Sequence, residues 1–549
     1  KEMITRDENH PSIIFWSNGN EGGFNYELEP DFALWDKQKR VVLYPWANRN
    51  GFETKHYRSY GETQEYMRQK EIFMPTEFLH GLYDGGHGAG LKDYWDMMMA
   101  NPRCAGGFLW DLMDQGVVRT DKNNYVDCMG NFGADGIVGP HAEKEGSYYT
   151  IKEVWCPVQL TWNDVEKGEL TLSNQYNFVN LKDCRFSYRL LQMPAMGSTQ
   201  VKVLKQGNLS SPDVAPGKEA QVKIPMMANA DAVEIKAVNH EGEEIMTWSR
   251  GVKSEERSVK NSSAPSTSSA AYADQADAVE VKAGGRTYRF AKKDGRLLGV
   301  EVGGKAISLS NGPRFMAARR SDRSLDQFYN HDDKEAEKKK TLYTEFVDQG
   351  AFVGFEWQVA EAKLVATYQH GSLDEVDWQF LSDGSVAVTC HYNFGGVVDM
   401  MGMAFDYLES KVRSKAWVGN GPYRVWQNRE QGPQYGYWQN DYNDPIPAES
   451  WDYPEFKGYF ANVKWMQFKT DEGKIGFSGL TADEHMGVYT PRDGRDGLLY
   501  TLPQTGLAVF KVIPSVRNKV NTTDLNGPSA QPKWLNGKGK AVFTLNFEL

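Results

Sequence analysis

The chain has 549 residues and a formal net charge of −11, and its acidic and basic side chains are spread along the sequence. No block of lysine and arginine stands out, which argues against nucleic acid or an anionic membrane as a partner. No apolar run reaches the roughly 18 residues that a membrane-spanning helix needs, so the sequence predicts a soluble protein of several domains.

The five cysteines are odd in number and irregularly spaced, and no CxxC pair occurs among them. This pattern argues against a disulfide framework or a zinc site. Aromatic residues make up 13% of the chain. Their flat rings suit the apolar faces of sugars, but ordinary packing in large β-sandwiches explains most of them equally well.

Residues 1–157 alternate short apolar runs with helix-like stretches. The runs that predict buried strands are residues 13–16, 41–44, 72–74 and 105–110. The helix candidates between them are residues 60–70 and 91–99. Alternating strands and helices predict parallel-sheet units, and in barrels of this kind the chemistry lies where strands end and loops begin.

The remainder of the chain is predicted to be rich in β-strands. In residues 158–250, apolar side chains such as Leu170 and Leu172 alternate with polar ones, which predicts a small immunoglobulin-like sandwich. Residues 251–273 are rich in serine and cannot bury a core, which indicates a flexible linker. Residues 274–549 suit one large β-sandwich. Clean alternation is expected at the following apolar positions: Val279, Val281, Tyr288, Phe290, Leu298, Val300, Val302, Phe543, Leu545, Phe547 and Leu549.

The strongest chemical signal is the run NHPSIIFWSNGNE, which ends at Glu21. An apolar strand here enters a polar Gly-Asn-Glu corner, so the carboxyl group of Glu21 can face the mouth of a barrel. It could protonate a leaving group there, while the amide of Asn20 binds a sugar hydroxyl. Taken alone, a glutamate after a strand is more commonly a loop residue or a helix cap.

A second glutamate at a strand end, Glu77, lies in the run IFMPTEFLHG. Two such carboxyl groups are what a glycosidase needs. A separation of about 5–5.5 Å implies a nucleophile and retention of configuration, whereas roughly 6.5–9.5 Å implies inversion. Two carboxyl groups this close are expected to share one proton at neutral pH.

These motifs resemble glycoside hydrolase family 2 and, within it, the large β-galactosidases of the LacZ type. RDENHPSIIFWSNGNE is similar to the acid/base signature of the family, MPTEFLHG to its nucleophile strand and GGFLWDLMDQG to its last barrel strand. The resemblance covers nearly the whole chain, including DGRLLGVEVGGKAISLSNGPRF near the start of the last region. It implies a retaining exo-β-glycosidase that acts on an oligo- or polysaccharide and, among terminal sugars, favours β-linked galactose.

The resemblance also implies residue roles. Glu21 would be the acid/base, and Asn20 would hold the 2-hydroxyl of the sugar. Glu77 would attack the anomeric carbon, supported by Tyr57 in KHYRSY. His56, beside Tyr57, is a weaker candidate for the site than its neighbour.

Further implied contacts concern the sugar and metal ions. His80 would contact the bound sugar, and Trp110 would offer a stacking platform. Glu21 would also be a ligand of Mg²⁺, with the other ligands upstream of residue 1. A monovalent cation would bind near Phe132 and Asp135, although Asp135 stands where the family usually has asparagine. No organic cofactor is implied.

The family order of strands predicts the architecture of the whole chain. Residues 1–157 would be the C-terminal part of a (β/α)8 TIM barrel, strands four to eight, because Glu21 follows strand four and Glu77 ends strand seven. A small immunoglobulin-like sandwich and a large sandwich of the β-galactosidase small-chain type would follow. The N-terminal half of the enzyme is therefore an expected partner, and homo-oligomers are common in the family. The compartment, whether cytoplasmic, periplasmic or secreted, stays open.

Several departures from the family bear on the substrate. Asn18 stands where the family usually has leucine, and Arg424 replaces an acidic residue in WVGNGPYRVW. The Asn-x-Lys pair that marks β-glucuronidases is not evident in GADGIV. Alternatives that remain are β-glucuronide, β-mannoside, β-galacturonide or α-L-arabinopyranoside as substrate, and an inactive fragment that needs its N-terminal half.

Overall fold

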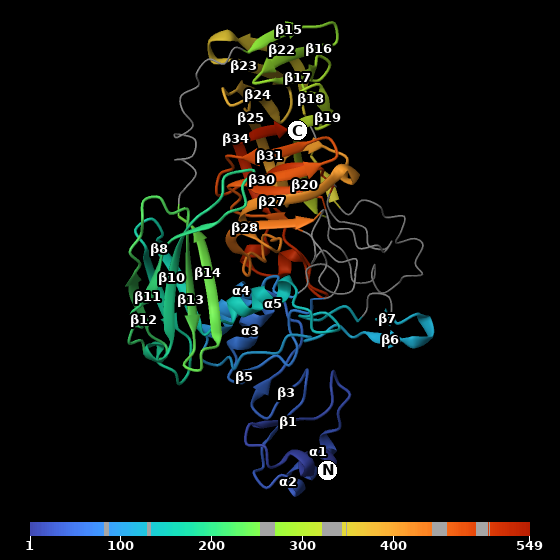
Figure 1. Ribbon diagram of the computed structural model, residues 1–549. Helices are drawn as coiled ribbons and strands as arrows, with labels where there is room; N and C mark the ends of the chain where they lie inside the picture. The colour runs from blue at the N-terminus through green and yellow to red at the C-terminus, as the bar shows by residue number, and fades with distance from the viewer. Residues whose placement is uncertain are drawn as a thin grey trace, which may run out of the picture.

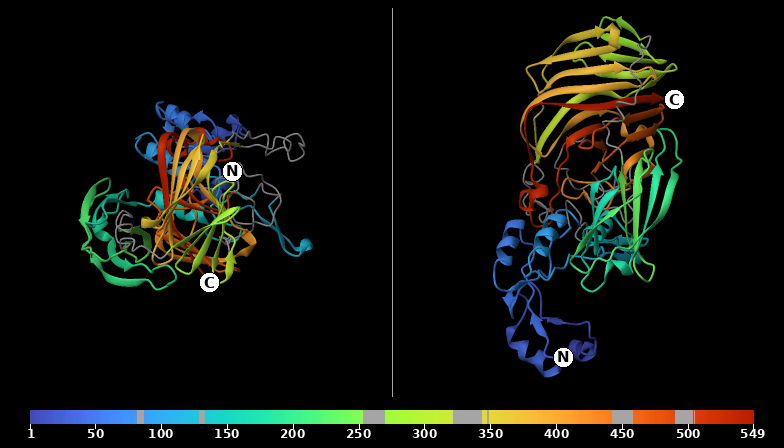
Figure 2. Two further views of the ribbon diagram at one scale, coloured as in Figure 1. Left: turned by 90° about the horizontal axis from the view of Figure 1, so that it is seen from above. Right: turned by 90° about the vertical axis from the view of Figure 1, so that its left-hand side faces the viewer.

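The computed structural model describes residues 1–81, 87–128, 133–252, 270–320, 343–346, 349–441, 458–489, 503 and 505–549. It is a multidomain structure made mostly of β-strands. The N-terminal part lies at one end of the molecule and the largest sandwich at the other, with a smaller sandwich along one side (Figures 1 and 2). None of the helices in these ranges is both long enough and apolar enough to cross a bilayer.

The described residues of the N-terminal part form short strands and five α-helices. The helices are α1 (Glu2–Asp7), α2 (Glu29–Trp35), α3 (Tyr60–Met67), α4 (Leu91–Met99) and α5 (Gly146–Val154). The strands are β1 (Phe15–Ser17), β2 (Val41–Leu43), β3 (Asn48–Arg49), β4 (Phe52–Glu53), β5 (Ile72–Phe73), β6 (Val117–Arg119) and β7 (Tyr125–Asp127). Parallel pairing joins β1 to β2 and β4 to β5, and these pairs belong to separate small sheets.

Most of the elements predicted for this part are confirmed. Helices α3 and α4 occupy the two predicted helical stretches, and β1, β2 and β5 fall within or beside the predicted strands. A capping box starts α3, because Ser59 and Glu62 satisfy each other's backbone N–H groups. The strand predicted at residues 105–110 is wrong, since only single bridges form there. Gly106 adopts a φ of +94° and turns the backbone out of the extended conformation.

The smaller sandwich packs a four-stranded sheet against a three-stranded one. Its strands are β8 (Val158–Asp164), β9 (Glu169–Asn174), β10 (Arg185–Gln192), β11 (Lys202–Leu209), β12 (Glu219–Lys223), β13 (Ala232–Val238) and β14 (Glu244–Gly251). The predicted alternation is confirmed, because Leu170 and Leu172 point into the shared core. The ends of the predicted linker are strand residues instead, since β14 reaches Gly251 and β15 begins at Ala271; residues 253–269 lie outside the described ranges.

In the ranges that the structure describes, the large sandwich contains sheets of nine, six and five strands. Its strands are β15 (Ala271–Asp274), β16 (Ala278–Ala283), β17 (Arg286–Ala291), β18 (Leu297–Val302), β19 (Lys305–Ile307), β20 (Ser310–Arg320), β21 (Tyr343–Glu345), β22 (Ala351–Gln358), β23 (Lys363–Gln369), β24 (Leu373–Phe380), β25 (Val386–Val398), β26 (Met400–Asp406), β27 (Val412–Gly421), β28 (Gln434–Asp441), β29 (Tyr459–Phe460), β30 (Trp465–Thr470), β31 (Lys474–Ser478), β32 (His485–Val488), β33 (Leu507–Val512) and β34 (Lys533–Glu548).

One continuous core lies between these sheets. The alternating tail is confirmed as far as Phe547, because Phe543, Leu545 and Phe547 on β34 are completely buried, whereas Leu549 follows the end of the strand and is exposed. Leu298 differs from the prediction and is exposed. A register shift in the pairing of β17 with β18 adds one residue at this point and turns that side chain outward.

The segment between β33 and β34 runs from the large sandwich back to the N-terminal part, beside α4 (Figure 1). The hydroxyl of Ser529 donates a hydrogen bond of 2.6 Å to Asp93 on α4. The backbone of Asn428 accepts a hydrogen bond of 2.7 Å from Gly90, which precedes that helix. The same segment also reaches predicted site residues, because the backbone N–H of Lys519 donates a hydrogen bond of 3.0 Å to the carbonyl oxygen of His80.

Candidate active site

The two predicted catalytic glutamates lie on loops that follow short parallel strands. Glu21 is in a tight turn after β1, where its φ is +45°, and its side chain is 48% exposed. Glu77 follows β5, and its side chain is mostly buried. One oxygen of each carboxyl group and a ring nitrogen of His56 all lie within 4.8 Å of one another. The structure thus brings Glu21 and Glu77 together.

His56 lies between the two carboxyl groups and is almost completely buried. Its Nδ1 atom is 3.2 Å from Oε1 of Glu21 and 3.6 Å from Oε2 of Glu77. Its Nε2 atom is 2.8 Å from the hydroxyl of Thr76. Sequence reasoning ranked His56 below its neighbour Tyr57. His56 stands in the same polar run as Tyr57, after an apolar stretch, and this position was the sequence signal that could have identified it.

Tyr57 supports Glu77 directly. Its hydroxyl donates a hydrogen bond to Oε2 of Glu77, and its backbone N–H donates one of 3.2 Å to the carbonyl oxygen of the same residue. Burial and the neighbouring Glu77 raise the pKa of Tyr57 far above its ordinary value. The phenol therefore stays protonated and remains a donor to the carboxylate.

A second group of side chains surrounds His80. Its Nε2 atom lies 3.7 Å from Oδ2 of Asp135 and 3.3 Å from the ammonium nitrogen of Lys519, a residue of the large sandwich. Burial, with smaller effects of Lys519 and His87, lowers the pKa of His80 well below its usual value. A neutral imidazole in this position offers a hydrogen-bonding group without adding positive charge.

Trp110 and Asp135 belong to the same group. The indole N–H of Trp110 donates a hydrogen bond of 3.1 Å to Oδ2 of Asp135, while 37% of the tryptophan remains exposed. Burial and the neighbouring Asp111 raise the pKa of Asp135 to about 7. Asn20 is exposed in the turn of Glu21, and its side chain makes no hydrogen bond to any described residue.

Two places could hold the metal ions that the resemblance implies. Oδ1 of Asp135 is buried and has no hydrogen-bond partner among the described residues, which fits a nearby cation. Phe132 lies outside the described residues. Glu21 and Glu77 offer the oxygen ligands that Mg²⁺ prefers, whereas His56 in the same cluster suits zinc or another transition metal better.

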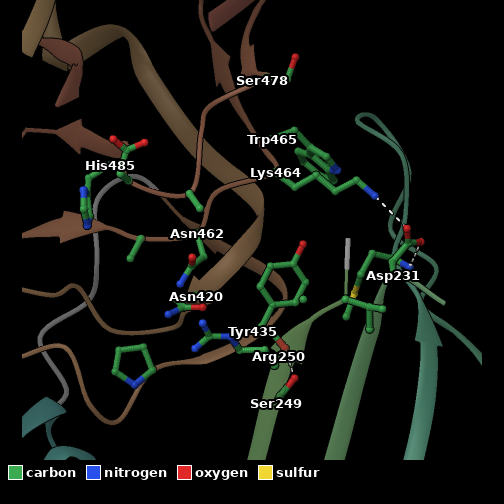
Figure 3. A pocket seen from close by; sticks show the side chains of 18 of the residues that line it. Asp231, Ser249, Arg250, Asn420, Tyr435, Asn462, Lys464, Trp465, Ser478 and His485 are labelled. Carbon is green, nitrogen blue, oxygen red and sulfur yellow. Dashed lines mark hydrogen bonds and ion pairs between the residues drawn. The ribbon is translucent and has the colours of Figure 1, made fainter. Parts of the chain in front are cut away.

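A large cavity lies away from these residues, between the two sandwiches (Figure 3). Its volume is about 2190 Å³, and the side chains around it include Arg250, Asn420 and Trp465. An ion pair of 3.1 Å between Lys464 and Asp231 bridges the sandwiches at its edge. None of the predicted site residues lines it, so its size carries no argument about the chemistry of the carboxyl groups.

Three family models match consecutive parts of the chain. The model described as glycosyl hydrolases family 2, TIM barrel domain, matches residues 1–138. The model for β-galactosidase, domain 4, matches residues 170–248, and the model for the β-galactosidase small chain matches residues 282–502. Their order along the chain agrees with the order of the three parts of the fold.

Similar proteins include several that are named β-galactosidase. The protein of Oenococcus oeni is 22% identical over 97% of this chain and 56% of its own length. The protein of Clostridium acetobutylicum is 23% identical over 80% of this chain and 51% of its own length. The protein of Priestia megaterium is 29% identical over 33% of this chain and 19% of its own length. The chain thus spans about half the length of the relatives that match most of it.

Proposed function

We propose that this chain, a member of glycoside hydrolase family 2 by its three matching domains, carries the catalytic carboxyl groups of a retaining exo-β-galactosidase. The observation that carries the proposal is the position of Glu21 and Glu77, since one oxygen of each carboxyl group lies within 4.8 Å of the other. This distance is closer to the roughly 5–5.5 Å between the carboxyl groups of retaining glycosidases than to the roughly 6.5–9.5 Å of inverting ones.

The environments of the two glutamates support different roles. Glu77 is mostly buried and accepts the hydrogen bond of Tyr57, as suits a fixed, ionised nucleophile. Glu21 is half exposed, so it can reach both a leaving group and a water molecule. We therefore assign Glu77 as the nucleophile and Glu21 as the acid/base.

The reaction would proceed in two steps. Glu77 attacks the anomeric carbon, the glycosidic C–O bond breaks, and Glu21 gives its proton to the departing oxygen. Glu21 then takes a proton from water, whose oxygen attacks the anomeric carbon and releases Glu77 from the glycosyl ester. The sugar is released with its original anomeric configuration.

Other residues would bind the terminal sugar. The exposed ring face of Trp110 suits stacking against a pyranose, and the neutral imidazole of His80 suits a hydroxyl. Asn20, one residue before the acid/base, would hold the 2-hydroxyl. Asp135 would bind a monovalent cation, and Glu21 would contribute to a Mg²⁺ site with further oxygen ligands. A bound cation would supply positive charge close to the sugar.

The proposal extends to the domains of the complete enzyme. Residues 1–157 would be the C-terminal part of a TIM barrel, which an N-terminal segment completes. Residues 158–250 would be the immunoglobulin-like domain, residues 251–273 the linker and residues 274–549 the large sandwich. The strands of the N-terminal part form separate small sheets, and the edge strands of such sheets leave backbone N–H and C=O groups unpaired. This supports the proposal that an N-terminal segment pairs with them.

The test is hydrolysis of aryl β-galactosides by the full-length protein. Glu77→Gln should lower kcat by about 10⁴-fold or more, because the nucleophile is lost. Glu65→Gln is the matched control, since Glu65 is an exposed glutamate on α3 whose ion-pair partner in the described part of the chain is Arg68, and it should leave kcat unchanged. Near-normal turnover by Glu77→Gln removes the assignment. Aryl β-glucuronide, β-mannoside, β-galacturonide and α-L-arabinopyranoside in the same assay identify the preferred sugar.

A further inference from the structure

We propose that His56 is a positioning residue, which holds the carboxyl group of Glu21 at its working distance from Glu77. The inference deepens the proposed function and rests on it. It goes further because it names the side chain that maintains the spacing on which retention depends. The inference rests on three contacts of His56, on the burial of its ring and on the exposure of Glu21.

The first step concerns how firmly His56 itself is held. The ring is almost completely buried and packs edge-on against Tyr57, with their centroids 5.6 Å apart. Its Nε2 atom is fixed by the hydroxyl of Thr76 at 2.8 Å. Because the ring is buried and Nε2 has a hydrogen-bond partner, the position of Nδ1 is fixed as well.

The second step concerns the partners that the two ring nitrogens face. Nδ1 faces oxygens of both Glu21 and Glu77, and an ionised carboxylate can only accept hydrogen bonds. When Nδ1 carries the proton it donates to Oε1 of Glu21, and Nε2 then accepts from the hydroxyl of Thr76. That hydroxyl can do so because its other acceptor, the carbonyl oxygen of Thr54, is farther away at 3.4 Å.

The third step is the difference between the two carboxyl groups. Glu77 is also held by the hydroxyl of Tyr57. In the described part of the chain, the carboxyl group of Glu21 has no hydrogen bond or ion pair except the one with His56. Glu21 is half exposed, so without that contact its flexible side chain would sample many orientations. Loss of His56 should therefore displace Glu21 more than Glu77.

The experiment compares three substitutions in the full-length protein. His56→Asn keeps a donor near the position of Nδ1, whereas His56→Gln keeps a polar group near Nε2 but none at Nδ1. His56→Phe keeps the ring and removes both nitrogens. We expect kcat for an aryl galactoside with a poor leaving group to fall about 100-fold in the Gln and Phe variants, the loss typical of a misplaced catalytic group. The Asn variant should stay within about fivefold of wild type, and KM should change little in all three.

A second background separates positioning from a general structural role. In Glu21→Ala, His56 has no acid/base to position. Adding His56→Gln to this variant should therefore lower kcat by a much smaller factor than the same substitution does in the wild type. Turnover in this background is measured with azide and an activated aryl galactoside, whose leaving group needs no proton. An equal loss in both backgrounds, or equal losses for His56→Asn and His56→Gln, overturns the inference.

Failure of the proposed function would look different. A 2-deoxy-2-fluoro galactoside traps a retaining enzyme as a covalent ester on its nucleophile, and intact mass detects the adduct. Absence of the adduct in the wild type overturns both the proposed function and the role of His56. A normal adduct on Glu77, together with equal losses for the Asn and Gln variants, overturns the role of His56 alone.

Discussion

The large sandwich and the N-terminal part hold their residues in opposite ways. In the sandwich, β25 and β34 pair over their whole shared length and bury aromatic rings such as Phe543. In the N-terminal part the strands are only two or three residues long, and Glu21, Tyr57 and Leu79 adopt φ values of +45°, +51° and +47°. Such left-handed conformations are unfavourable for these residue types and persist only where the surroundings impose them.

The region that stabilises the fold is therefore different from the region that carries the candidate catalytic residues. Long strands with an apolar face stabilise the sandwich, whereas the candidate site is built on loops in unfavourable conformations. Among its described residues, the sandwich contributes to the site through the segment between β33 and β34: Lys519 contacts His80, and Asn521 donates a hydrogen bond of 3.1 Å to the carbonyl oxygen of Tyr57. A stable region thus supplies contacts to loops that are built on unfavourable backbone conformations.

The largest expected effect tests the sandwich core. Phe543→Ala should lower the free energy of unfolding of the sandwich by about 3–5 kcal/mol, because it leaves a cavity beside Phe405 and Phe477. Trp534→Ala on the same strand is the control, and it should change stability by less than about 0.5 kcal/mol because Trp534 is 70% exposed. Urea unfolding followed by circular dichroism measures both. A smaller effect for Phe543 than for Trp534 would contradict the comparison.

A second expectation concerns acid stability of the sandwich. Burial lowers the pKa of His485 on β32 to about 4, so the folded protein keeps this imidazole neutral. The unfolded chain binds a proton at higher pH than the folded one does. Stability should therefore be highest above pH ~6.5 and fall by up to about 3 kcal/mol as the pH drops to ~4.

Urea unfolding at several pH values, with His485→Gln as the comparison, measures this effect. The variant lacks the titrating group, so its stability should depend less on pH in this range. Parallel pH dependences for the wild type and the variant would show that His485 has no part in acid sensitivity.

A smaller effect should appear at the contact between the two regions. Asn521→Ala removes the hydrogen bond to Tyr57 and should cost about 1 kcal/mol of stability. It should also lower kcat, because the loop that carries Tyr57 loses a restraint. Thr522→Ala, at the next residue, is the control, since its hydroxyl donates a hydrogen bond to the exposed Asp524 and to no other described residue. Unchanged activity in Asn521→Ala would show that the N-terminal loops hold their shape without the sandwich.

The smallest effect is expected on the surface. Arg413 and Asp471 form an exposed ion pair on the large sandwich. Arg413→Ala should leave the unfolding midpoint unchanged within experimental error, because solvent and salt screen such pairs. A clear shift would mean that surface charges, in addition to the core, stabilise the sandwich.

Local patterns were enough to predict many elements. Alternation along the tail identified β34, and the apolar runs before Glu21 and Glu77 identified two strand ends that meet in space. Leu298 was misjudged because a bulge depends on the partner strand and leaves no mark in a short stretch of sequence.

Contacts between distant parts of the chain were the hardest to predict. His56 is one histidine in a polar loop, and only the fold puts it between two carboxyl groups. Lys519 lies 439 residues after its partner His80, so no spacing in the sequence points to the pair. Side-chain chemistry is visible in a sequence, whereas the neighbours of a side chain depend on packing.

The return of the segment around Lys519 to the candidate site affects the order of events during synthesis. The loops of Tyr57 and His80 leave the ribosome long before the residues that restrain them. A nascent chain that has completed its N-terminal part still lacks these contacts, and it gains them only when the large sandwich has been translated and docked. Translation that stops early would therefore release a protein with both glutamates but with a loosely held pocket.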